Sequence, residues 1–219
     1  MNIENLRSDV RRWGWMRALF IRVMLYLERY AGIHIYRVHT RSLGQHPHPP
    51  EVPSDMTLRI LTPEELLKAA GDRELDMSES FVRAALARGD SAFGAFDGNH
   101  LAGYVWRTVT AAPVRDGLWA RVNPPYHYSY KGFIRPPYRG KRIHAAISLL
   151  LCDPYFLERG YTGETGYTDI HNFASIASHN FTGRQRIGFA GYVQWFGYRI
   201  PFRTSGAKKI GFEFFEARY

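Results

Sequence analysis

A short basic loop between a predicted strand and a predicted helix holds the residues best suited to binding an anion. The strand is HYSYKGFI (residues 127–134), and an apolar helix begins near Ile143. A helix that starts directly after such a turn presents backbone N–H groups to an anion, and its dipole favours negative charge there. The side chains of Arg139, Lys141 and Arg142 in the loop can add charge-assisted hydrogen bonds. The loop therefore predicts a site for a phosphate-bearing ligand.

Hydrophobic patterns place this loop in a mixed α/β (α+β) domain. Thr62 is followed by Pro63 at the first helical position and by Glu65 three residues after the cap, a signature of a helix start. The segment SAFGAFDGNHLAGYVWRTVT (91–110) predicts a hairpin that turns at its DGN sequence. The aromatic-rich segment FAGYVQWFGYRIPF (189–202) is predicted to be one closing strand.

The N-terminal segment predicts a basic amphipathic helix ahead of this domain. Apolar residues recur every three or four positions from residue 3 to about 31. Four arginines lie on the opposite face: Arg7, Arg11, Arg22 and Arg29. With Trp13 and Trp15, such a helix has features of one lying at a membrane surface, and the alternative is that its apolar face packs on the domain or on a second subunit. Gly14 weakens a continuous helix by about 1 kcal/mol relative to Ala.

Composition narrows the classes of partner. The 219 residues include 29 Lys and Arg against 20 Asp and Glu, so the surface suits a nucleic acid, an anionic lipid, a phosphorylated cofactor or an acidic carrier protein. No nucleic-acid-binding motif accompanies this charge, so no specific nucleic acid is expected. The one cysteine, Cys152, excludes a disulfide within the chain, and its apolar helix predicts a buried packing role. His46 and His48 have no third ligand nearby, so no metal site is predicted.

The apolar stretch ALFIRVMLYL (18–27) is too short to span a membrane and is interrupted by Arg22. Glu28, Arg29 and Tyr30 follow it, where a signal peptide would need small residues. These features predict a cytoplasmic protein, with contact at the inner face of a membrane as an open alternative. The predicted parts of the chain are residues 1–45 (the helix and a short strand), residues 46–55 (a Pro-rich linker) and residues 56–219 (the α/β domain).

In order and spacing, the motifs resemble the GNAT superfamily of acyl-CoA-dependent N-acyltransferases. The first motif matches at Ile134, Pro136, Tyr138, Arg139, Gly140 and Lys141. The second matches at Asn172 and Ser175, with Gly188 and Phe189 closing it. The resemblance covers about residues 56–219 and implies a mostly antiparallel sheet whose fourth and fifth strands splay apart in a V. It also implies transfer of an acyl group from acyl-CoA to a primary amine by direct attack on the thioester.

The resemblance implies a donor site on the splayed strand, the basic loop and the second motif. The expected donor-binding residues are Gly132, Phe133, Ile134, Arg139, Gly140, Lys141, Arg142, Ile143, His144, Asn172 and Ser175. The family has small residues where this chain has Arg142 and His144. Three alternatives stay open: CoA binds with these side chains turned outward, a phosphopantetheine arm of an acyl carrier protein binds as in N-acyl amino acid synthases of this fold, or donor binding is lost.

The resemblance also assigns roles to polar and aromatic residues. A tyrosine seven residues after the second-motif asparagine often protonates the leaving thiolate in this family, and here that position is His179. A histidine can do the same near neutral pH. The candidates for a base that takes the proton of the amine are Glu164, Tyr128, Asp169, His127 and a water molecule. The aromatic residues on strands that border the acceptor cleft are Trp106, Tyr126, Tyr128 and Trp195, which would suit a large or apolar substrate.

Two further hypotheses stand beside an acyl-CoA enzyme. The chain could transfer a long acyl group from an acyl carrier protein, whose acidic surface would complement the basic loop. Alternatively, it could be a non-catalytic basic module that binds lipid or nucleic acid. A homodimer is a further open expectation, because the apolar helix face would suit a second copy.

Overall fold

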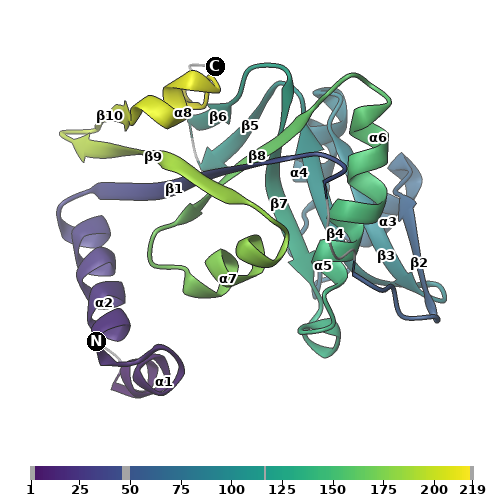
Figure 1. The fold of residues 1–219 in the computed structure, drawn as a ribbon, viewed down its shortest axis with the longest axis horizontal. Helices are drawn as coiled ribbons and strands as arrows, with labels where there is room; N and C mark the ends of the chain where they lie inside the picture. The colour runs from purple at the N-terminus through teal and green to yellow at the C-terminus, as the bar shows by residue number, and fades with distance from the viewer. Residues whose placement is uncertain (1–2, 46–49, 116, 218–219) are drawn as a thin grey trace.

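Most strands of the computed structural model lie in one large sheet (Figure 1). The structure describes residues 3–45, 50–115 and 117–217. From edge to edge, the sheet contains β10 (Tyr198–Arg203), β9 (Gln185–Trp195), β1 (Ile33–Ser42), β8 (Gly163–Asp169), β7 (Tyr126–Ile134), β4 (His100–Thr108), β3 (Ser91–Asp97) and β2 (Met56–Ile60). Neighbouring strands are antiparallel except for β7 and β8, which are parallel. The predicted mixed, mostly antiparallel sheet is confirmed.

Helices and a small second sheet cover the two faces of the large sheet (Figure 1). One face is covered by a continuous helical run made of α5 (Ile143–Ala146), a π-helical segment (Ile147–Cys152) and α6 (Asp153–Leu157), and by α7 (Phe173–Phe181). The other face is covered by α3 (Pro63–Ala70), α4 (Glu79–Ala87), the small sheet of β11 (Glu213–Glu216), β6 (Leu118–Arg121) and β5 (Ala111–Arg115), and α8 (Ser205–Lys209). We call these the α5–α7 face and the small-sheet face.

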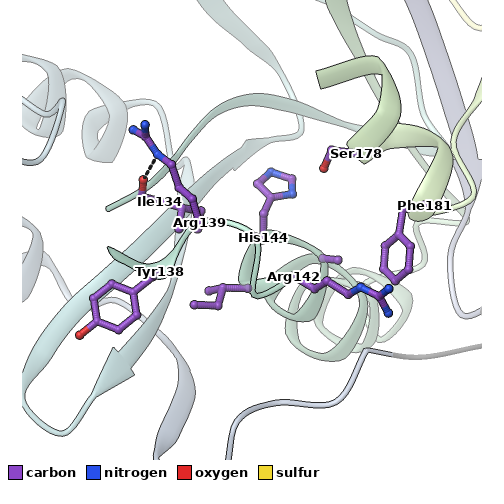
Figure 2. A pocket seen from close by; sticks show the side chains of 10 residues that line it. Ile134, Tyr138, Arg139, Arg142, His144, Ser178 and Phe181 are labelled. Atoms are coloured by element: carbon purple, nitrogen blue, oxygen red, sulfur yellow. Dashed lines mark hydrogen bonds between the residues drawn. The ribbon is translucent and has the colours of Figure 1, made fainter. Parts of the chain in front are cut away.

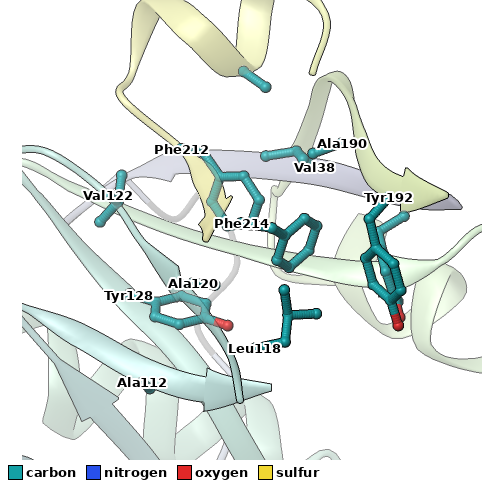
Figure 3. Close-up of a cluster of buried hydrophobic side chains, with 12 residues drawn as sticks. Val38, Ala112, Leu118, Ala120, Val122, Tyr128, Ala190, Tyr192, Phe212 and Phe214 are labelled. Carbon is teal, nitrogen blue, oxygen red and sulfur yellow. The ribbon is translucent and has the colours of Figure 1, made fainter. Parts of the chain in front are cut away.

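Buried apolar clusters hold these layers together. On the α5–α7 face, Ile147 packs in one cluster with Phe93 of β3. On the small-sheet face, Tyr192 of β9 packs with Phe212 and Phe214, which come from the C-terminal part of the chain (Figure 3). Burying a side chain of this size stabilises the fold by roughly 1.5–3 kcal/mol relative to leaving it exposed. The sheet is therefore fixed from both sides.

Several local predictions are confirmed. The backbone N–H of Glu65 donates to Oγ1 of Thr62 at 3.3 Å and the N–H of Thr62 donates to Oε2 of Glu65 at 3.0 Å, so the capping box begins α3 as expected. Gly98 takes a positive φ of 55° in the turn of the β3–β4 hairpin. Cys152 is fully buried, and burial raises its pKa to about 12, in agreement with a packing role.

Two predicted elements differ from the structure. The N-terminal helix is divided into α1 (Ile3–Trp13) and α2 (Trp15–Tyr30), because Gly14 between them adopts a φ of 83°. The predicted closing strand is wrong: it is a hairpin of β9 and β10 that turns at Phe196 and Gly197, whose φ angles are 45° and 82°. A continuous run of aromatic and β-branched residues hid this turn, because an isolated glycine in such a run also suits a bulge.

The N-terminal strand β1 lies inside the large sheet rather than beside it. It pairs with β8 on one side, where Ser42 lies opposite Gly163, and with β9 on the other, where Ile33 lies opposite Val193. The local pattern of this strand predicts a place ahead of the linker, because that pattern does not show which strands it joins. The linker boundary stays a prediction, and the two histidines at positions 46 and 48 lie outside the described residues.

Candidate functional site

The parallel strands β7 and β8 open into a V. They pair only along Tyr126–Tyr128 of β7 and Gly163–Thr165 of β8, and beyond these residues they diverge. Successive residues of β4 pair with Ser129 and Lys131, so Tyr130 is the extra residue of a β-bulge in β7. The splay predicted from the family resemblance is thus confirmed, and the bulge lies where the strands separate.

The predicted anion-binding loop lines a pocket of about 340 Å³ at the open end of the V (Figure 2). After β7, a 3₁₀ turn (Pro136–Tyr138) leads to Gly140 and Arg142, whose φ angles are 83° and 58°. Glycine adopts this left-handed conformation freely, whereas for arginine it costs about 1–2 kcal/mol. The residues that line the pocket are Ile134, Tyr138, Arg139, Gly140, Arg142, Ile143, His144, Ala145, Ser178 and Phe181.

The first turn of α5 belongs to the wall of this pocket. Ile143, His144 and Ala145 line it, and N–H groups in the first turn of a helix have no acceptor within the helix. The helical run continues from Ile143 to Leu157, so a full helix dipole points at the pocket. This end of the helix can therefore donate hydrogen bonds to an anion.

The three basic side chains of the loop have different positions. Nε of Arg139 donates to the carbonyl oxygen of Ile134 at 3.0 Å, which holds the guanidinium beside the end of β7. The guanidinium of Arg142 lies 4.3 Å from the ring centre of Phe181 on α7. Lys141 is exposed and does not line the pocket. In the part of the chain that the structure describes, neither Arg139 nor Arg142 is paired with a carboxylate, so both can face an anionic ligand.

His144 points into the pocket from α5 (Figure 2). Its Nε2 would lie 3.2 Å from a Cβ atom placed on Gly132, so the glycine makes room for the imidazole beside the splayed strand. Burial and the charges of Arg184 and Arg107 lower the pKa of His144 to about 3. His144 is therefore a neutral part of the pocket wall rather than turned outward, and Arg142 stacks on Phe181 at the rim.

A cluster of buried charged side chains lies on the α5–α7 face. Glu164 of β8 is ion-paired with Arg41 of β1 and with Arg184, and its Oε1 lies 3.4 Å from Arg107 of β4. Asp153 of α6 binds Arg41 through both oxygens, at 2.6 and 2.7 Å. All five side chains are at most 2% exposed. We call these residues the arginine cluster; its three guanidinium groups outnumber its two carboxylates.

Four histidines with lowered pKa values surround the arginine cluster. Burial and then the charge of Arg184 lower the pKa of His39, His144 and His179. Burial is also the main cause that lowers the pKa of His127 to about 3. All four imidazoles are therefore neutral at pH 7. Within the described ranges, no set of three His, Cys, Asp or Glu side chains could hold a metal ion.

The predicted proton donor His179 lies over the splayed half of β8. Its Nδ1 lies 3.2 Å from Oγ1 of Thr168, and its ring centre lies 4.1 Å from that of His39. The lowered pKa keeps the imidazole of His179 neutral near pH 7, so it is not poised as an imidazolium acid. Negative charge that develops nearby would raise that pKa, so its role as an acid stays a prediction.

Two of the candidate bases, Glu164 and Tyr128, lie on opposite faces of the sheet. Burial would raise the pKa of Glu164, but the charges of Arg184 and Arg41 outweigh it and hold the pKa well below its usual range. A carboxylate held in this way accepts a proton poorly, so its catalytic role stays a prediction and the geometry favours a structural one. Tyr128 is fully buried in the small-sheet cluster, where burial and the neighbouring Tyr167 raise its pKa.

The second motif forms a helix start rather than a wall of the pocket. Oδ1 of Asn172 accepts a hydrogen bond from the backbone N–H of Ser175 at 3.1 Å, which caps α7. Neither residue lines the pocket of the basic loop, which α7 reaches through Ser178 and Phe181 instead. The predicted contact of both residues with a donor stays untested, and their visible task is to begin α7.

The structure does not bring the predicted acceptor-site aromatics together. Trp106 is fully buried beneath Phe81, with ring centres 5.4 Å apart. Tyr126 lies at the closed end of the V, beside Gly163. Trp195 is 62% exposed near the end of the β9–β10 hairpin. Their contact with a substrate stays a prediction, because their placement depends on how strands distant in sequence are arranged.

A different pocket, of about 480 Å³, lies on the small-sheet face of the splay. It is lined by Phe81, Pro113, Val114, Arg115, Gly117, Trp119, Tyr130, Lys131 and Tyr167. Tyr130 and Tyr167 come from the diverging parts of β7 and β8, so this pocket borders the splay as the first does. The sequence does not predict this pocket, because Pro113 makes β5 a poor strand candidate.

No protein-family model matches the sequence, and no curated protein matches it either. Among solved structures, the chain is similar to a GCN5-related N-acetyltransferase from Sphaerobacter thermophilus, with 14% identity and a TM-score of 0.52 over 83% of this chain and 55% of that one. An N-acetyltransferase from Staphylococcus aureus Mu50 aligns at 14% identity over 74% of this chain and 99% of its own, with a TM-score of 0.47. This chain thus spans little more than half of the first relative, and the similarity is one of fold. The chain has the GCN5-related N-acetyltransferase (GNAT) fold.

Proposed function

We propose that this protein is an acyltransferase that moves an acyl group from a phosphate-bearing thioester, such as acyl-CoA, to an amine. The observation that carries the proposal is a pair of pockets on opposite faces of one splay. The first opens beside Ile134 on the α5–α7 face, and the second beside Tyr130 and Tyr167 on the small-sheet face. A donor and an acceptor that enter from the two sides would meet between β7 and β8.

The residues of the first pocket suit a donor of this kind. The first-turn N–H groups of α5 and the guanidinium groups of Arg139 and Arg142 would hold its phosphates. The diverging half of β7 offers backbone groups that β8 does not pair, which suit the amides of a pantetheine arm. Gly132 keeps the strand accessible beside His144, because a Cβ there would lie only 3.2 Å from the imidazole.

The charge around the splay suits the reaction. In a direct transfer, the nitrogen of the amine bonds to the acyl carbon, the C–S bond breaks, and a proton from the amine ends on the departing sulfur. Negative charge develops first on the carbonyl oxygen and then on the sulfur. The three arginines that lower the pKa values of the neighbouring histidines would stabilise that charge from a water-poor interior.

Filling the first pocket is expected to weaken donor binding. Ser178 is exposed on α7 and lines the pocket, so Ser178→Trp would occupy its volume at little cost to the fold. We expect the affinity for acetyl-CoA, measured by calorimetry, to fall at least about tenfold, which corresponds to ~1.4 kcal/mol.

The matched control is Ala177→Trp, the neighbouring exposed position on α7, which does not line the pocket. It should bind acetyl-CoA as the wild type does. Equal affinities in all three proteins would place the donor elsewhere and remove the first pocket from the proposal.

Replacing His179 by alanine tests the proton donor. His179 lies beside Thr168 on the splayed half of β8, and charge that develops on the sulfur would favour its protonated form. We expect kcat to fall by about 10²-fold with the affinity for the donor unchanged, as for loss of a general acid. An unchanged kcat would exclude this role and leave the arginine cluster as the source of stabilisation.

The position of His144 gives some support to a carrier-protein donor. Its imidazole occupies part of the pocket, and Arg142 stacks on the rim, which favours one phosphate over a pyrophosphate. Calorimetry with acetyl-CoA, palmitoyl-CoA and a palmitoylated carrier protein separates the hypotheses. Binding of either CoA ester supports the main proposal, and binding of the carrier protein alone supports the alternative. Binding of none would favour a non-catalytic module.

A further inference from the structure

We infer that α1, α2 and the β9–β10 hairpin form a surface that docks on an anionic lipid bilayer, a property independent of the proposed acyl transfer. Of the large apolar side chains that are exposed in the described ranges, most lie on these elements rather than on the rest of the molecule. No described helix is long and apolar enough to cross a membrane, so the inferred contact is with the membrane surface.

One side of α2 is both apolar and uncovered. The residues on it are Trp15, Met16, Leu19, Val23, Tyr26 and Tyr30, each at least 45% exposed. At 3.6 residues per turn, these six positions fall within a sector about 100° wide, with no charged residue among them. In a protein that stays in water, such a helix face would normally be turned toward the core.

The other side of α2 already packs on the protein. Ala18 and Ile21 are buried. The ring of Phe20 at the edge of this side lies 6.2 Å from that of Phe173 at the start of α7. Arg22 is ion-paired with Asp9, which fixes α1 against α2. The exposed face is therefore held outward by these contacts.

The β9–β10 hairpin continues this apolar surface. Trp195, Phe196, Tyr198 and Ile200 are 58–85% exposed. The hairpin lies beside the end of α2, because the N–H of Gln194 donates to the carbonyl oxygen of the residue at position 32 at 2.8 Å. Tryptophan and tyrosine, which are common on both elements, prefer the boundary between lipid and water.

Charge favours a lipid over a second copy of the chain. The exposed arginines of α1 and α2 are Arg7, Arg11, Arg12, Arg17 and Arg29, and none is ion-paired with a carboxylate in the ranges that the structure describes. A symmetric dimer through this face would bring two such sets together, with like-charge repulsion. An anionic bilayer instead supplies apolar depth for the helix face and phosphate groups for the arginines.

The test is flotation of the full-length protein with vesicles. We expect it to float with phosphatidylcholine vesicles that contain phosphatidylglycerol, to float poorly with phosphatidylcholine alone, and to be released by high salt. Val23→Asp should reduce the bound fraction about tenfold or more, because a carboxylate is expelled from the apolar layer. The matched control is Ile60→Asp on β2, since Val23 and Ile60 are 45% and 44% exposed.

Two outcomes would overturn the inference. One is equal flotation of the wild type, Val23→Asp and Ile60→Asp, which would show that the apolar face of α2 does not bind the lipid. The other is a wild-type protein that does not float and that light scattering shows to be a dimer, while the Val23→Asp variant is a monomer. In that case the apolar face of α2 is the interface between two copies of the chain. Thermal unfolding of both variants confirms that each is folded before it is compared.

Discussion

Replacing Glu164 by alanine is expected to lower the free energy of unfolding by about 3–5 kcal/mol, because breaking a buried ion pair leaves its partners without compensation. In the wild type, Glu164 faces Arg41, Arg107 and Arg184. Without it, Arg107 and Arg184 would lose the carboxylate that they face, at most 2% exposed to water, and Arg41 would keep only Asp153. The measurement is urea-induced unfolding followed by circular dichroism.

Glu158→Ala is the matched control for this effect. The side chain of Glu158 is 79% exposed and lies 4.0 Å from Arg159, a pair of the kind that contributes little. Its removal should change the free energy of unfolding by less than about 0.5 kcal/mol. A similarly small effect for Glu164→Ala would contradict the view that the arginine cluster is a coupled, water-poor unit.

The second large effect concerns pH: the free energy of unfolding should fall steadily as the pH is lowered from about 6.5 toward 3. Burial lowers the pKa of His127 and His144 to about 3, whereas in the unfolded chain both titrate near 6.5. Between these values the unfolded chain binds protons that the folded protein refuses, so acid favours unfolding. Each such histidine lowers the free energy of unfolding by at most about 1.4 kcal/mol for every pH unit of acidification in this range. The pKa of Glu164 is also lowered in the folded protein. Its contribution to the free energy of unfolding is therefore present above its pKa in the unfolded chain and is lost as the pH falls through its pKa in the folded protein.

Two histidine variants isolate this effect. His127 is fully buried, with its ring 3.9 Å from that of Phe156, whereas His100 is exposed. Urea unfolding at a series of pH values should show a shallower slope for His127→Gln and an unchanged slope for His100→Gln. If the His127→Gln slope equals that of the wild type, His127 is charged in the folded protein and the burial argument is wrong.

Features that depend on neighbouring residues could be predicted from the sequence. The capping box at Thr62 and Glu65 and the turn at Gly98 need contacts only a few residues apart, so their patterns are complete in a short window. The basic loop is of the same kind, because the strand, Arg139, Arg142 and the helix start are contiguous. The splay between β7 and β8 came from the resemblance to a family, and no local pattern indicates it.

Features that depend on strand order could not be predicted in this way. Glu164 was a candidate base because carboxylates suit that role, but its arginine partners come from three separate strands or strand edges. A single arginine within an apolar strand, such as Arg107, is the one local sign of such a buried charge. Trp106 and Trp195 were assigned to one cleft, yet one is buried under α4 and the other is exposed in a hairpin.

The place of β1 in the sheet has a consequence for how the chain is made. Ribosomes synthesise β1 early, but its partners β8 and β9 begin only at Gly163 and Gln185. During translation, this strand with its buried Tyr36 and Val38 therefore waits with both edges unpaired, which is an aggregation hazard. A shortened gene that starts after the linker would not express a smaller intact domain. It would leave a gap between β8 and β9, and the arginine cluster would lack Arg41.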